Sequence, residues 1–134
     1  MFAGRILLTG LAVTTIVGTA AADLGSLHSL NPNWPPHARL HAIWSVMHVT
    51  ATQLLAISLL WTGGPPTRLL RAHTAALLLL AFAVSFFVSA AIAPAFGATM
   101  TPDVSPADMP PRPLGWDGNL FSFVVAAPFV LGGW

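Results

Sequence analysis

The sequence predicts an all-α integral membrane protein, a bundle of four transmembrane helices with a proline-rich outer loop. Of the 134 residues, 55% are hydrophobic and only 7% are charged, whereas soluble domains have about 25% charged residues. The mean hydropathy is +0.76. Four apolar segments approach or reach the length of about 17–25 residues that a helix needs to cross a bilayer. We therefore expect a single membrane domain over residues 1–134.

The composition also excludes several classes of protein. The formal net charge is only +1, so nothing indicates binding to nucleic acid. The chain has no cysteine, which excludes a disulfide scaffold. So few charged side chains cannot cover the surface of a soluble enzyme. The expected partners are therefore membrane lipid, other membrane subunits or further copies of this chain.

The first apolar segment covers residues 6–22 and follows Arg5. A positive charge, an apolar stretch and the small residues Ala20, Ala21 and Ala22 are also typical of a secretory signal peptide. We expect the segment to be retained as a signal-anchor helix, and cleavage after Ala22 is the alternative.

The second and third segments have clear boundary signals. The second covers residues 40–61 and directly follows Pro35 and Pro36. This pair marks a helix start, because proline suits the first position of a helix. The third covers residues 69–93, with Thr67 as a candidate N-cap. Pro94 ends it, since proline cannot continue a helix without losing a hydrogen bond.

The fourth segment, residues 120–134, is the shortest. Asp117 or Asn119 can cap its start, but it is only about 22 Å long at 1.5 Å per residue, and Pro128 interrupts it. We expect it either just to span the bilayer or to stop short of the far headgroups. The preceding segment 94–118 is rich in proline, and we expect an extended, semi-rigid loop over the outer face.

The arginines determine the expected orientation. Arg5, Arg68 and Arg71 lie before the first segment and between the second and third, where no acidic residue occurs. Because short arginine-rich loops stay in the cytoplasm, we expect both termini inside and loops 23–39 and 94–118 outside, in a bacterial inner membrane. Tryptophans near the segment ends suit the aromatic belt at the headgroups: Trp34, Trp44, Trp61, Trp116 and Trp134.

Two rows of small residues are expected to bring helices together. They recur at every fourth position: Gly10, Thr14, Gly18 and Ala22 in the first segment, and Ala81, Ser85, Ser89 and Ala93 in the third. In lipid, helices associate where small side chains let their backbones approach. We expect the two rows to pack against each other, and chance in an alanine-rich chain is the alternative.

A polar stripe on the second helix is the main candidate for a site. At about 100° per residue, one face of that helix has His37, His41, Ser45, His48 and Thr52. Ionisable groups within a bilayer normally face the bundle interior or a wet cavity. We therefore expect the stripe to point inward and Thr50, on the other side, to face lipid. Arg39 is expected to extend outward or to pair with an aspartate of an outer loop.

Several chemistries would use these histidines. His37 and His41 are one helical turn apart, as two metal ligands on a helix are, and His28 could supply a third. His48 could be the single ligand of a haem or chlorophyll. Alternatively, neutral His41 and His48 form hydrogen bonds to neighbouring helices, or the stripe lines a polar pocket for an organic ligand or takes part in a proton relay.

Segment 28–41 reads H-S-L-N-P-N-W-P-P-H-A-R-L-H. It resembles the motif H-x-x-N-P-x-W-P-P-H-A-[RK]-x-H of an uncharacterised family of small four-helix membrane proteins from bacteria and fungi. In that family the motif joins the first two helices. The resemblance implies the same fold and a shared site at the outer mouth, but no activity. In physical terms, the prolines fix the loop, Trp34 anchors it at the headgroups and Asn31 can close an Asx turn.

From the sequence we expect an accessory or ligand-binding membrane protein whose histidine-lined pocket opens to the outer face. The candidate ligand-binding residues are His28, Asn31, Trp34, His37, His41, Ser45 and His48, and His37 and His41 are the candidate metal ligands. The alternative is a small membrane enzyme, or a redox or pigment subunit, that uses His37, His41 and His48 to bind a metal, haem or chlorophyll or for acid–base catalysis. The sequence has no evident nucleophile–base–acid constellation, which places the enzyme second to the ligand-binding protein.

Overall fold

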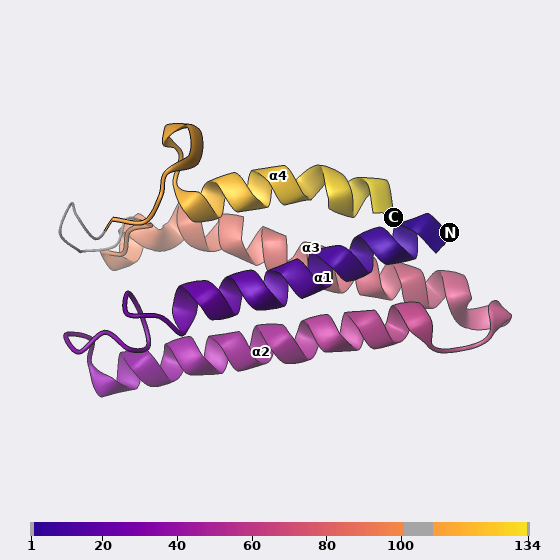
Figure 1. Ribbon diagram of the computed structural model, residues 1–134, viewed down its shortest axis with the longest axis horizontal. Coiled ribbons are helices and arrows are strands. Elements are labelled where there is room, and N and C mark those ends of the chain that lie inside the picture. The colour runs from indigo at the N-terminus through magenta and orange to yellow at the C-terminus, as the bar shows by residue number, and fades with distance from the viewer. Residues whose placement is uncertain (1, 101–108, 134) are drawn as a thin grey trace.

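The computed structural model describes residues 2–100 and 109–133. Four helices run in alternating directions, as Figure 1 shows: α1 (Phe2–Asp23), α2 (Pro36–Trp61), α3 (Arg68–Ile92) and α4 (Gly118–Gly133). The described residues contain no strand, which confirms the all-helical prediction. We name the two ends of the bundle after their loops, as the 24–35 end and the 62–67 end. α1 begins and α4 finishes at the 62–67 end (Figure 1).

Three of the helices have the properties of membrane spans. α1, α2 and α3 contain 22, 26 and 25 residues, or about 33–39 Å at 1.5 Å per residue. All three are long and apolar enough to cross a membrane, and this supports the prediction of an integral membrane protein. α4 has 16 residues with Pro128 inside it. At about 24 Å it is apolar but shorter than a typical span.

The sequence signals for helix starts are correct at two of three places. α2 begins at Pro36, with proline in its first turn. Asp117 caps α4, because its Oδ1 accepts hydrogen bonds from the backbone amides of Asn119 and Leu120 at 2.9 and 3.1 Å. Thr67 precedes α3 but forms no capping bond. Its hydroxyl donates to the carbonyl of Gly64 at 3.3 Å instead, because residues 65–67 form a separate 3-10 turn.

The expectation of an extended loop over segment 94–118 is only partly met. Ala93–Phe96 and Pro113–Gly115 form short 3-10 turns, and the first ends at Gly97 in the left-handed conformation with φ +65°. A 3-10 turn tolerates proline at its start because the missing amide has no partner there. Residues 101–108, which include Asp103 and Asp108, and the belt residue Trp134 lie outside the described residues.

The apolar core lies toward the 62–67 end. Leu8 and Ala12 of α1 meet Ala56 and Leu60 of α2 and three residues of α3, namely Ala75, Ala76 and Leu79. The alanines let the three backbones approach closely, which is the main source of helix association in lipid.

Two arginines converge on the end of α2. Arg5 Nε donates to the carbonyl of Leu60 at 2.6 Å, and Arg71 Nε donates to the carbonyl of Leu59 at 3.4 Å. Arg71 also donates from Nη2 to the hydroxyl of Thr62. The last carbonyls of a helix have no partner within it and bear a partial negative charge. The arginines of α1 and α3 therefore provide donors for the last carbonyls of α2 and hold the three helices together at this end.

Trp61 reinforces the same end. Its indole Nε1 donates to the hydroxyl of Thr9 at 2.8 Å, and the guanidinium carbon of Arg5 lies 5.0 Å from the centre of its ring. Phe2 packs edge-on against the ring at 6.2 Å. A cation over an indole face is attracted to the ring in addition to its hydrogen bonds, so α1 and α2 are held by several kinds of contact here.

Candidate ligand-binding site

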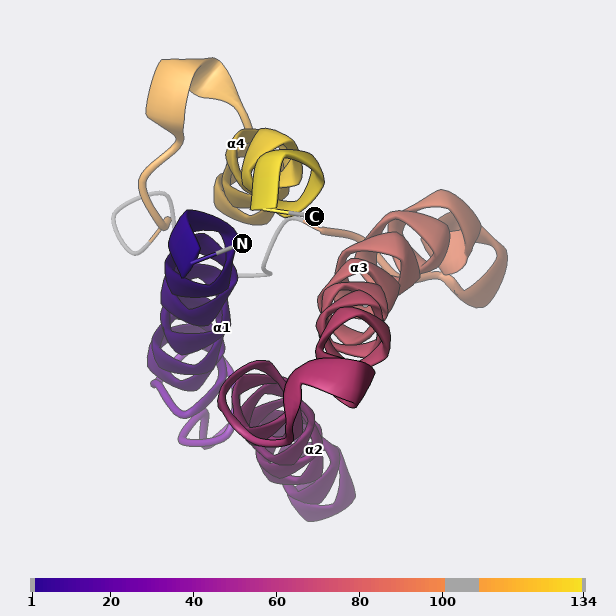
Figure 2. The same ribbon diagram turned by 90° about the vertical axis from the view of Figure 1, so that its right-hand side faces the viewer.

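A cavity of about 450 Å³ lies between the four helices on the side of the 24–35 end. Its lining residues come from every helix, and Figure 2, which looks along the bundle, shows the four helices arranged around a common axis. Along α1 the lining extends from Leu11 to Asp23, or about 18 Å at 1.5 Å per residue. The cavity therefore reaches from the 24–35 end to about the middle of the bundle.

Part of each row of small residues faces this cavity. We expected them to touch, but Thr14, Gly18 and Ala22 of α1 line one side, and Ser85 and Ser89 of α3 line another. α1 and α3 lie diagonally opposite in Figure 2. The prediction of direct packing is wrong, because α1 and α3 each pack mainly against α2 and little against each other. Their small side chains leave space for the cavity and do not form a contact between α1 and α3.

Hydroxyl groups dominate the polar part of the lining. They belong to Thr14, Thr15, Thr19, Ser45, Ser85, Ser89 and Ser122. Four of them donate their proton to a carbonyl of their own helix, at 2.8 to 2.9 Å: Thr14 to Gly10, Thr15 to Leu11, Ser85 to Phe82 and Ser122 to Gly118. Such bonds back to the preceding turn are common for serine and threonine in helices.

Aromatic rings form the wall between α3 and α4. Phe86 and Phe123 stack with centres 4.2 Å apart and planes 14° apart, and Phe82 lies 5.4 Å from Phe123. All three line the cavity. Stacked rings provide a rigid apolar surface at little cost in side-chain entropy. The site thus combines an aromatic wall with hydroxyl-bearing walls, as sites for amphipathic organic molecules do.

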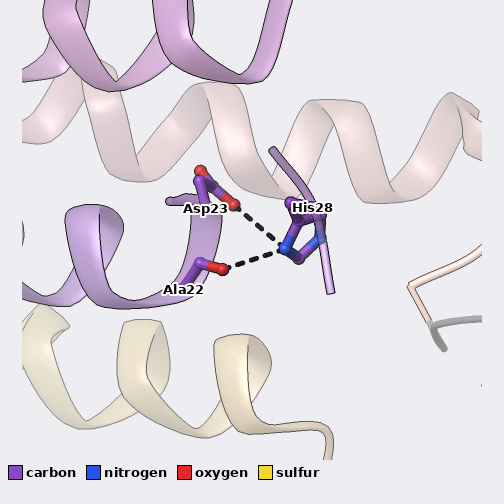
Figure 3. Close-up of polar contacts among 3 residues, drawn as sticks. All are labelled: Ala22, Asp23 and His28. Atoms are coloured by element: carbon purple, nitrogen blue, oxygen red, sulfur yellow. Dashed lines mark hydrogen bonds and ion pairs between the residues drawn. The ribbon is translucent and has the colours of Figure 1, made fainter. Parts of the chain in front are cut away.

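Asp23 lines the cavity where it approaches the 24–35 end. Figure 3 shows Ala22 and Asp23 at the end of α1 and the ring of His28 turned toward both. The Nδ1 atom of His28 lies 3.0 Å from the carbonyl oxygen of Ala22 and 3.6 Å from Oδ1 of Asp23. Because a carbonyl only accepts, Nδ1 bears the proton and donates it to Ala22. The carboxylate of Asp23 therefore stays an available acceptor.

The loop that contains the motif has the expected turn at Asn31, but Arg39 makes a contact that the sequence did not predict. The backbone amide of Asn33 donates to Oδ1 of Asn31 at 2.9 Å, so the expected Asx turn is present. The rings of His28 and Trp34 pack edge to face at 5.2 Å. Arg39 forms no ion pair with the aspartates that the structure describes, Asp23 and Asp117. Its Nε donates to the carbonyl of Trp34 at 3.2 Å and fastens the loop to the start of α2.

The two candidate metal ligands do lie together. The Nε2 atoms of His37 and His41 are 3.0 Å apart and their rings are perpendicular, with one nitrogen donating to the other. Both side chains are exposed. Within the described residues, no group of three or more histidines and acids could hold a metal ion. His28 therefore does not complete a three-ligand site with this pair.

The prediction that the polar stripe points inward is wrong. His37, His41, Ser45 and His48 are exposed, whereas Thr50, expected to face lipid, is half-buried. The buried face of α2 runs along Val46, Val49, Gln53, Ala56 and Leu60, about 100° around the helix from the stripe. α1 and α3 pack against that face, where Ala56 and Leu60 join the apolar core that the three helices share. Of the stripe, only Ser45 reaches the cavity.

Sequence reasoning missed most of the cavity lining. The sequence places Asp23 in the loop 23–39 and gives no signal for Ser122 and Phe123 on α4. The rows of Thr14, Gly18, Ser85 and Ser89 are the available signal, although their spacing equally predicts a packing surface. The histidines dominated the interpretation because ionisable groups in a membrane are rarer than hydroxyls.

Comparison with family models, with curated proteins and with solved structures finds no match to this chain. The resemblance of segment 28–41 to a family of small four-helix membrane proteins therefore stays a prediction.

Proposed function

We propose that this chain is a ligand-binding integral membrane protein that holds a small amphipathic molecule in the cavity between its four helices. The supporting observation is the cavity itself, about 450 Å³ with hydroxyls and phenylalanines in its lining. Pockets of about 300–1,000 Å³ bind small organic ligands. Polar groups inside a membrane bundle typically mark the path or the site of a ligand. The hydroxyl-lined cavity replaces the histidine-lined pocket as the binding site.

We further propose that all four helices cross the inner membrane of a bacterium, with both termini in the cytoplasm. Arg5, Arg68 and Arg71 at the 62–67 end support this orientation, because short arginine-rich segments stay inside. The short α4 crosses if the bilayer thins locally, which costs fractions of a kcal/mol per ångström of mismatch. The cavity then opens toward the outer face and meets lipid-soluble molecules of the outer leaflet.

Photolabelling in lipid nanodiscs tests the binding function. The probe is a dodecanol that bears a diazirine in its chain, and mass spectrometry locates the labelled residues. An added Cβ at either Gly18 or Gly10 meets no atom within 4 Å, but only Gly18 lines the cavity. Gly18→Leu should narrow the cavity and reduce labelling of its lining, and Gly10→Leu should leave labelling unchanged. Labelling confined to lipid-facing residues, or unaffected by Gly18→Leu, would contradict the proposal.

The second candidate function is metal or pigment binding, as a redox or pigment subunit. The observation that favours it is the approach of the Nε2 atoms of His37 and His41 to 3.0 Å, close to the spacing of two ligands on one tetrahedral ion. His48 is exposed on the same helix, where it could ligate a haem or a chlorophyll from the lipid side. An absorption spectrum with metal analysis of the purified protein tests this. Metal binding should disappear in His41→Gln and pigment binding in His48→Leu, and both should persist in His73→Gln.

A further inference from the structure

The hydroxyl groups of the cavity present mainly acceptors to a ligand. Thr14, Thr15, Ser85 and Ser122 have each committed their proton to a carbonyl of their own helix, at 2.8 to 2.9 Å. A hydroxyl has one proton but two lone pairs, so each oxygen can still accept a hydrogen bond from the cavity. A ligand group that only accepts would find no proton at these four positions without breaking a bond within the helix.

The charge in the lining also favours a ligand group that donates hydrogen bonds. Asp23 is the one ionisable residue in the lining, and no arginine or histidine joins it within the described residues. The side chain of Asp23 is 32% exposed, and the proton on Nδ1 of His28 goes to the carbonyl of Ala22. The carboxylate therefore adds a negative acceptor to the wall. The amide of Asn119 provides the lining with one side-chain donor at the same end.

The apolar lining extends away from Asp23. Leu11 lies at the other limit of the cavity on α1, and the rings of Phe82, Phe86 and Phe123 cover the α3 and α4 sides. A molecule with one polar head and one chain can place the head at Asp23 and the chain among the rings. The distance of about 18 Å along α1 accommodates a chain of lipid length.

On these grounds we infer that the cavity selects lipophilic amines, with the protonated amine against Asp23 at the 24–35 end, whereas Thr14 and Thr15 lie about 12–14 Å deeper along α1 and line the path of the chain. This inference rests on the proposed binding function and adds the class of ligand. A protonated amine offers three donors and no acceptor, so it complements the carboxylate of Asp23, and the hydroxyls deeper in the cavity offer no competing donor at Thr14, Thr15, Ser85 and Ser122. An alcohol fits less well because it has a single donor. A carboxylate or phosphate head offers only acceptors and is repelled by Asp23, so anionic lipids are excluded.

Four photoreactive probes with the same diazirine-bearing dodecyl chain test this selectivity. They end in an amine, an alcohol, a methyl ether and a carboxylate, and each is applied to the full chain in nanodiscs of neutral lipid. Site-mapped labelling of the cavity lining separates binding from partition into the bilayer. We expect the amine to label the lining at least about tenfold more than the carboxylate, with the alcohol above the ether.

Two variants at the 24–35 end define the role of the charge. Asp23→Asn should reduce labelling by the amine to the level of the alcohol and leave the alcohol unchanged. Asp117→Asn is the matched control, because Asp117 does not line the cavity and asparagine keeps the oxygen that caps α4. Amine labelling that is equally strong in Asp23→Asn would overturn the inference.

The two proposals fail differently. Equal labelling of the cavity by all four probes would mean that it accepts any chain, which refutes the selectivity and leaves ligand binding intact. Labelling of the cavity by none of the probes would refute the binding function itself.

Discussion

Replacing Gly63 with alanine tests whether the hydrogen bonds of Arg71 hold the 62–67 end together. Gly63 has a φ of +84°, a left-handed conformation that costs other residues about 1–2 kcal/mol. A Cβ there would lie 2.8 Å from Cδ and 2.9 Å from Nε of Arg71. The arginine must move, and its bond to the carbonyl of Leu59 is lost. A bond from a charged donor contributes about 1.5–3 kcal/mol, which the partial exposure of Arg71 reduces to about 1 kcal/mol.

The expected loss for Gly63→Ala is therefore about 2–3 kcal/mol of the free energy of unfolding. Titration with SDS in mixed micelles, followed by circular dichroism, measures it. Gly64→Ala is the control, because Gly64 has φ −86° and ψ 174° and its added Cβ would lie an ordinary 3.6 Å from Cδ of Pro66. That change should be neutral or stabilising by up to about 1 kcal/mol, since alanine narrows the unfolded ensemble.

A double variant separates the two contributions. In an Arg71→Ala background the clash is absent, so Gly63→Ala should cost only its backbone part of about 1–2 kcal/mol. The reasoning is refuted if the full cost persists in that background, or if Gly64→Ala costs as much as Gly63→Ala. Either result would mean that the loop, and not the arginine, determines the stability of this end.

Three other changes have definite expected outcomes. Gln53 is fully buried and neither atom of its amide has a hydrogen-bond partner in the described structure. Gln53→Leu should therefore raise the free energy of unfolding by about 1–3 kcal/mol. A lower free energy of unfolding in the same SDS titration would show that the amide has a partner. Asp117→Ala removes the cap of α4 and should cost about 1 kcal/mol, measured as faster amide exchange in its first turn, whereas unchanged exchange would argue against the cap. Single cysteines at Thr67 and Leu114 should react with a membrane-impermeant maleimide from the cytoplasmic and the outer side respectively, and reaction of both from one side would contradict four crossings.

The sequence predicts the helices well because their signals are local. The apolar length of α2 and α3, the proline at the start of α2 and the aspartate before α4 each act within a few residues of chain. Whether α4 crosses is harder to predict, since 16 residues with Pro128 are close to the limit that a bilayer allows.

The rotation of each helix could not be predicted from the same signals. In lipid there is no strong apolar side to identify, and a polar stripe indicates only that some face avoids lipid. His37 and His41 lie in the first turns of α2, where residues 36–45 include no buried side chain, so no other helix covers them. The convergence of Arg5 and Arg71 on α2 was also missed, because carbonyls at a helix end leave no mark in the sequence.

The unequal support of the two ends determines how the bundle moves. The arginines on α2 and the cluster around Ala56 and Leu60 lie at the 62–67 end, and the cavity lies toward the other. Local opening requires least free energy where the fewest buried contacts must break. Thermal motion should therefore separate α1 and α3 at the 24–35 end while the helices stay packed at the 62–67 end. A molecule enters and leaves the cavity through this transient opening while the helices stay folded. Once bound, it contacts both helices and reduces the amplitude of the opening.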